Sequence, residues 1–75
     1  MTYKNDDLLH TPDGEDVRCI CADDQSAVFA PILLMRERDG TSYTKTIYKG
    51  LFVLPNDGGQ VKGYMRIRKH QLQGA

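Results

Sequence analysis

The chain lacks the features that place a protein in a membrane or a secretory compartment. None of its 75 residues belongs to an uninterrupted apolar stretch of about 18 residues, so we expect no membrane-spanning segment. Residues 1–7 are mostly polar and do not have the basic-then-apolar order of a signal peptide. These two absences predict a cytoplasmic protein without a membrane partner.

Cysteine is scarce: Cys19 and Cys21 are the only two, separated by Ile20. On one strand they would share a face, with Cα atoms about 6.5–7 Å apart, at or beyond the limit of a relaxed disulfide. We expect two small buried side chains in a reducing compartment. The competing hypothesis is half of a thiolate metal site, which would need His10, His70 or a second subunit to supply further ligands. We predict no metal.

A recognisable catalytic constellation is also missing. Ser26 and Ser42 have no nucleophile-elbow context. The glycine pair 58–59 lacks the Lys-Ser/Thr and the following helix of a phosphate loop. The three pairs of adjacent acidic residues point apart in extended structure, whereas acid–base work needs two converging carboxyl groups. We therefore expect no enzymatic activity and no cofactor.

Neither sign of charge is in excess, because ten basic residues balance ten acidic ones. This balance argues against a globally basic nucleic-acid binder. The distribution is uneven, since residues 1–24 carry a net charge of −5 and the remainder carries +5. We expect the acidic part to lie beside the basic part within one fold, because chain ends of small domains often lie close together. The alternative is a dipolar protein that presents a basic strand to an anion.

The size and composition that are present fit one small globular domain over residues 1–75. Hydrophobic residues make up 40% of the chain and charged residues 27%, which is ordinary for a folded protein. We interpret residues 1–12 as a polar N-terminal segment, in which a short helix from about Asn5 could form before Pro12 stops it. Residues 71–75 are expected to be a frayed tail.

Turn signals divide the chain into short strands. Residues 16–22 alternate as a strand does, and residues 23–26 break the pattern as a loop. Residues 27–38 contain good helix formers but have Pro31 in the middle. We predict a strand over residues 32–38 with a bulge or a sheet edge at Pro31. A short helix remains the alternative there.

The second half begins with a hairpin signal. Asp39 and Gly40 have the pattern of a two-residue type I′ turn. Residues 41–48 are rich in Thr, Tyr and Ile and suit the strand after that turn. The apolar run 51–54 is expected to be central and buried, and residues 55–59 to form a turn.

The clearest alternation covers residues 60–70. It predicts a half-buried strand with one apolar face directed inward and one basic face directed outward. The inward set is Val61, Gly63, Met65 and Ile67, and the outward set is Lys62, Tyr64, Arg66, Arg68 and His70. The pattern as a whole favours a mostly β fold of four to five strands, to which one short helix could be added. A small antiparallel half-open barrel or curled sheet, SH3-like or OB-like, is expected, and no motif identifies a family.

The outward face of strand 60–70 is the main candidate binding surface. Interleaved cations and a tyrosine can follow a phosphate backbone while the ring stacks on a base. The competing interpretation is a solvated edge strand, whose Lys and Arg discourage association between sheets. The preceding hairpin could extend this surface. The candidate binding residues are Lys62, Tyr64, Arg66, Arg68, His70, Tyr43 and Lys45.

We interpret the chain as a non-catalytic small β binding module that docks to a protein partner or to its own copy. A homo-oligomer is expected, because a domain of this size gains from added burial. Strand 60–70 or the apolar run 51–54 would then lie between chains. The alternative is a nucleic-acid-binding module that uses the basic and aromatic face of strand 60–70, with binding that weakens steeply with salt.

Overall fold

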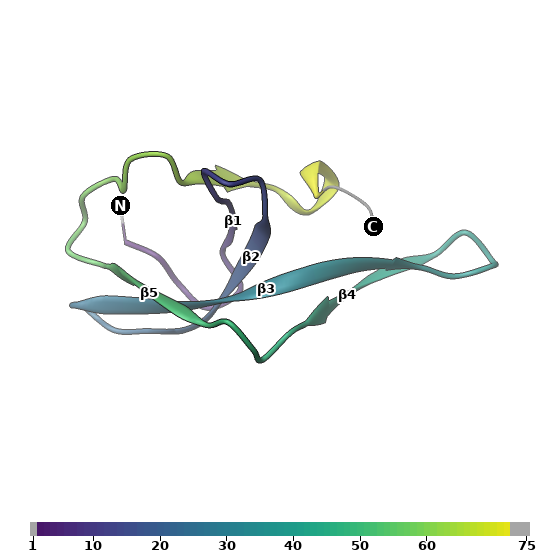
Figure 1. Ribbon diagram of the computed structural model, residues 1–75, viewed down its shortest axis with the longest axis horizontal. Coiled ribbons are helices and arrows are strands. Elements are labelled where there is room, and N and C mark those ends of the chain that lie inside the picture. The colour runs from purple at the N-terminus through teal and green to yellow at the C-terminus, as the bar shows by residue number, and fades with distance from the viewer. Residues whose placement is uncertain (1, 73–75) are drawn as a thin grey trace.

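The computed structural model describes residues 2–72, which form a single open antiparallel sheet without an α-helix (Figure 1). The mostly β class expected from the sequence is therefore confirmed, and within these residues no helix could span a membrane. Of the predicted frayed tail, residues 73–75 lie outside the described range. The elements are β1 (Leu8–His10), β2 (Asp16–Ala22), β3 (Ser26–Arg36), β4 (Ser42–Thr46), β5 (Phe52–Pro55), β6 (Met65–Ile67) and the 3₁₀ turn η1 (Lys69–Gln71).

The longest strand, β3, organises the sheet. The strand order is β4-β3-β2-β1-β6, and β5 also pairs with β3. Residues 26–29 of β3 pair with β5 and residues 32–36 pair with β4, while β2 occupies the opposite edge. The β3–β4 hairpin, residues 32–46, projects from the packed end of the domain and is called the arm below (Figure 1). This projection gives the domain its elongated shape of 42 × 20 × 19 Å.

The strand predicted for residues 32–38 starts earlier, because β3 runs without interruption through Pro31. The carbonyl of Pro31 accepts a hydrogen bond from the Ile47 amide at 2.8 Å. In an extended strand the nitrogen and the carbonyl of one residue point to the same side. The ring nitrogen of Pro31 therefore points to the side of β3 that carries β5 and β4. Its missing amide hydrogen removes no hydrogen bond to β2 on the other side.

The prediction of a two-residue type I′ turn at 39–40 is wrong. Glu37 donates its amide to the Thr41 carbonyl at 2.8 Å, and Gly40 donates to the Glu37 carbonyl at 3.2 Å, so the loop has three residues. Gly40 has φ 91°, whereas Asp39 does not adopt a positive φ. Three-residue hairpin loops of this kind combine a type I turn with a left-handed residue. The Asp39 carboxylate accepts hydrogen bonds from the Thr41 side chain and amide, which lowers the pKa of Asp39.

The predicted N-terminal helix does not form. Asp6 adopts a positive φ of 74° in a turn, and the chain then enters β1, which lies between β2 and β6. The segment expected to be polar thus supplies part of the core, since Tyr3 and Leu9 are buried. The main cluster of buried core residues is Tyr3, Leu9, Val17, Cys19, Ala27, Phe29 and Leu54.

Aromatic rings tie the core together. The Tyr3 ring meets Phe29 edge-on at a centroid distance of 5.3 Å, and Phe52 stacks on Phe29 at 5.7 Å. The apolar run 51–54, however, is not central as predicted. It forms the edge strand β5, in which Leu54 is buried and Val53 is 59% exposed. A strand that pairs on one side only and covers the core with one face needs only every second side chain to be apolar.

A β-bulge in β2 separates the two cysteines, which were expected to share a face. Cys19 pairs with Phe29 and Cys21 with Val28, so the register shifts by one residue between them. Cys19 is consequently buried and Cys21 exposed, and both are free thiols. Burial raises the pKa of the Cys19 thiol.

We predict that a thiol reagent distinguishes the two cysteines. Because the thiolate is the reactive form, Cys21 should react with Ellman's reagent under native conditions, while Cys19 should react only as the domain unfolds. Stopped-flow absorbance should show one fast thiol per chain. Cys21→Ala should remove the fast phase and Cys19→Ala should keep it; equal rates for both thiols would contradict the bulge.

Candidate functional site

The predicted basic strand 60–70 is a loop, a short strand and a 3₁₀ turn in the structure. Only Met65–Ile67 pair with β1. The predicted side-chain directions are wrong at two neighbouring residues: Met65, assigned to the core, is 63% exposed, whereas Tyr64 is half-buried and its ring lies 6.0 Å from that of Phe52. The physical reason is the turn at Gly63, whose φ of 88° interrupts the period-two alternation.

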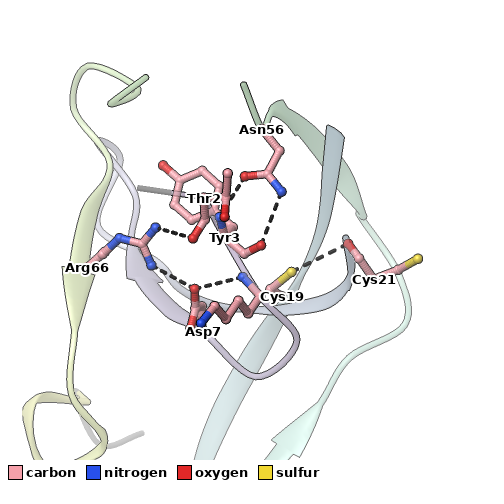
Figure 2. A network of polar contacts seen from close by, with 8 residues as sticks. Thr2, Tyr3, Asp7, Cys19, Cys21, Asn56 and Arg66 are labelled. Carbon is pink, nitrogen blue, oxygen red and sulfur yellow. Dashed lines mark hydrogen bonds and ion pairs between the residues drawn. The ribbon is translucent and has the colours of Figure 1, made fainter. Parts of the chain in front are cut away.

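Arg66 reaches back to the N-terminal segment, although its side chain stays partly exposed (Figure 2). Its guanidinium donates to the Asp7 carboxylate at 2.7 Å and to the Thr2 carbonyl at 3.0 Å. The guanidinium carbon also lies 4.5 Å from the centroid of the Tyr3 ring, a cation–π geometry. The acidic and basic parts of the chain are thus adjacent, as their charges led us to expect.

The remaining predicted site residues are distributed over the loop before β6, the segment around η1, and β4. The side chains of Lys62, Arg68 and His70 are exposed. Tyr43 and Lys45 lie on β4, paired with Met35 and Leu33 of β3. Because side chains alternate along a strand, these β4 residues face away from Ser42 and Thr44, which are on the side of His70.

The residue that holds the N-terminal segment was not among the site residues predicted from the sequence. Asn56 follows β5 and is buried, with 3% of its surface exposed. Its Oδ1 accepts the Tyr3 amide at 2.6 Å, and its Nδ2 donates to the Tyr3 carbonyl at 3.1 Å (Figure 2). The Nδ2 also donates to the Asp23 carbonyl at 2.7 Å. The side-chain amide pairs with residue 3 as a neighbouring strand would. The surrounding Pro-Asn-Asp-Gly-Gly pattern indicated only a turn.

The competing hypothesis of a thiolate metal site finds no supporting geometry. In the described part of the chain, no three His, Cys, Asp or Glu side chains converge on one point. His10 is instead paired with Asp16, Nδ1 to Oδ1 at 3.0 Å.

Exposed apolar side chains gather on one face of the arm. Leu33 and Tyr43 are 44% and 47% exposed. The pairing of Leu33 with Lys45 and of Met35 with Tyr43 places these four side chains on the same face. Tyr48, just beyond β4, is still more exposed. This face is not needed for the core of the domain, so it is available to contact another chain.

The outer edge of β4 presents unpaired backbone groups. Between residues 2 and 72, β4 pairs with β3 alone. The bonds from Glu37 to Thr41 and from Ile47 to Pro31 mark two hydrogen-bonded pairs of this hairpin. Such pairs alternate in an antiparallel ladder, so Tyr43 and Lys45 bond to β3. The amides and carbonyls of Ser42, Thr44 and Thr46 consequently point away from β3.

No protein-family model, curated protein or solved structure matches the chain. The SH3-like or OB-like architecture therefore stays a prediction, and functional inference rests on the geometry of the sheet.

We predict that Asn56→Ala lowers the free energy of unfolding by about 2–4 kcal/mol, because it leaves the buried amide and carbonyl of Tyr3 without partners and also removes the bond to the Asp23 carbonyl. Chemical denaturation followed by circular dichroism measures the change. The control Gln60→Ala alters an exposed loop side chain and should cost less than about 0.5 kcal/mol. Equal effects of the two substitutions would show that Asn56 does not hold the N-terminal segment.

Proposed function

We propose that the protein is a non-catalytic β binding module that self-associates through the free edge of β4. The observation that carries this proposal is the row of outward-directed backbone groups at Ser42, Thr44 and Thr46, beside the exposed apolar side chains of the arm. A strand edge of this kind accepts another strand, with main-chain hydrogen bonds supplying affinity. A homodimer is the expected assembly, because two-fold symmetry brings identical edges together.

The chemistry of β4 favours one antiparallel register, with the two-fold axis at Thr44. Ser42 then pairs with the partner's Thr46, and every outward-directed group of the strand finds a bonding counterpart. Tyr43 meets the partner's Lys45 across a non-hydrogen-bonded pair, where an ammonium group can approach the ring. Moving the axis to Lys45 would oppose two lysines, and moving it to Tyr43 would lose a bonded pair.

The other two sheet edges are poorer candidates. β6 has three residues, and β5 has four and ends with Pro55, which cannot donate a hydrogen bond. The runs expected to lie between chains, 51–54 and 60–70, therefore offer less backbone than β4. The nucleic-acid alternative has less support than self-association, because the Tyr64 ring and the Arg66 guanidinium already contact other residues of the chain.

We predict that opposite charges at residue 44 control assembly. Sedimentation velocity over a concentration series should show a dimer for the parent chain and monomers for Thr44→Lys and for Thr44→Glu, because each variant opposes like charges across the axis. An equimolar mixture of the two variants should recover the dimer, and high salt should weaken that recovery.

The matched controls are Gln60→Lys and Gln60→Glu, which introduce the same charges in the loop after β5 and should leave the dimer unchanged. A parent chain that is monomeric at every concentration would overturn the proposal. So would a dimer that both Thr44 variants retain.

A proline pair tests the direction of the backbone groups. Thr44→Pro removes an outward amide and spares the bonds to β3, so the dimer should be lost while the circular dichroism spectrum is kept. Tyr43→Pro removes an amide that faces β3 and should reduce the thermal unfolding temperature. The opposite pattern, in which Thr44→Pro destabilises the monomer more than Tyr43→Pro does, would contradict the assigned register.

A further inference from the structure

A basic hollow lies on the face of the arm opposite the exposed apolar side chains. It has a volume of about 480 Å³ and lies where η1 comes over the β3–β4 hairpin, as the two elements are arranged in Figure 1. Two segments that are distant in sequence supply its walls. The residues that line it are Leu34, Arg36, Ser42, Lys69, His70 and Leu72.

The charge in this hollow is one-sided. Arg36 and Lys69 bring two cationic groups to it, His70 and the Ser42 hydroxyl add further polar groups, and none of the described residues that line it is acidic. Neither Arg36 nor Lys69 forms an ion pair with an acidic side chain of residues 2–72, where the paired cations are His10, Arg18 and Arg66. Two such cations beside a hydroxyl group suit an oxyanion, for which an arginine fork offers parallel donors.

Two leucines give the hollow part of its lining. Leu72 is buried, with 8% of its surface exposed, and Leu34 is half-buried. An anion bound here would therefore rest on aliphatic surface. Among residues 2–72, no aromatic ring lines the hollow, although rings are what single-stranded nucleic-acid sites use to stack bases.

A second hollow of about 460 Å³ adjoins the first, since Lys69 lines both. Leu8 and Ile67 give it apolar surface, and it also contains Asp6 and Asp7. These carboxylates are paired with Arg18 and Arg66. A phosphate backbone, which is negative throughout, would approach them unfavourably, whereas an extended peptide can place one acid at the basic end and apolar side chains along the rest.

We propose that this groove binds an extended peptide segment in which a carboxylate side chain is flanked by aliphatic residues, with Arg36 and Lys69 holding the carboxylate. His70 and Ser42 supply additional donors, and Leu34 and Leu72 contact the aliphatic neighbours. The groove is complete within one chain and lies on the opposite face from Leu33 and Tyr43, so the proposal does not depend on self-association.

The probe is the peptide acetyl-Leu-Glu-Leu-Glu-amide, titrated into the ¹⁵N-labelled full chain and followed by NMR. Shifts should be confined to the groove, at the amides of Leu34, Arg36, Ser42 and Leu72. The matched peptide with glutamine in place of glutamate should bind at least about fivefold more weakly, because the charge-assisted hydrogen bonds are lost. The double substitution Arg36→Gln with Lys69→Gln should weaken binding of the acidic peptide by a similar factor.

The control substitutes Arg38→Gln with Lys62→Gln, which remove the same charge outside the groove and should leave the affinity within about twofold. Equal affinity for the two peptides, or equal losses in the two double variants, would overturn the proposal. Two competitors test the ligand class. Displacement of the peptide by an equal concentration of inorganic phosphate would reduce the groove to an oxyanion site, and tighter binding of octathymidylate at the same amides would assign it to nucleic acid; either result overturns the peptide proposal.

Discussion

The pairing of β3 with β2, β4 and β5 is the constraint on which the other features depend. The eleven-residue strand β3 contributes Phe29 to the core in its first half and forms one strand of the arm in its second half. This continuity requires Pro31 to lie where its missing amide costs no ladder bond, at the junction between β5 and β4. The arm, its free edge and the groove beneath η1 exist because β3 extends beyond the packed end of the domain.

A small sheet with one covered face needs additional closure, and here the N-terminal segment provides it. Tyr3 fills the core against Phe29, and the side chains that hold it come from the far end of the sequence. Asn56 pairs with its backbone, while Arg66 lies over its ring and reaches Asp7. Charge neutralisation, ring contact and backbone pairing thus act on the same short segment. A cation that alternates with apolar residues in the sequence, such as Arg66, can therefore hold another segment of the same chain against the core and need not bind a ligand.

The two surfaces that remain are on opposite faces of the arm. One carries Leu33 and Tyr43 beside the free edge of β4, and the other carries Arg36 under η1. A strand exposes alternate side chains to its two faces, so a two-stranded arm can present an aliphatic and aromatic surface and a cationic one at the same time. Strand docking at the edge would use backbone groups of β4, whereas peptide binding would use side chains of β3 and η1.

Local pattern by itself determined the mostly β class, the strand at residues 16–22 and the turns near Gly40 and after Pro55, because period two and turn chemistry depend on neighbours in the chain. It also marked Tyr43, Lys45 and His70 among the candidate binding residues, although not the faces on which they lie. Only the tertiary structure decided that Cys21 is exposed, that Tyr64 and Arg66 turn toward the core, and that β4 has a free edge. A bulge, a left-handed glycine at residue 63 and the sharing of β3 between two strands each change which side chain meets which neighbour. Such pairings join residues far apart in sequence, and no alternation along the chain encodes them.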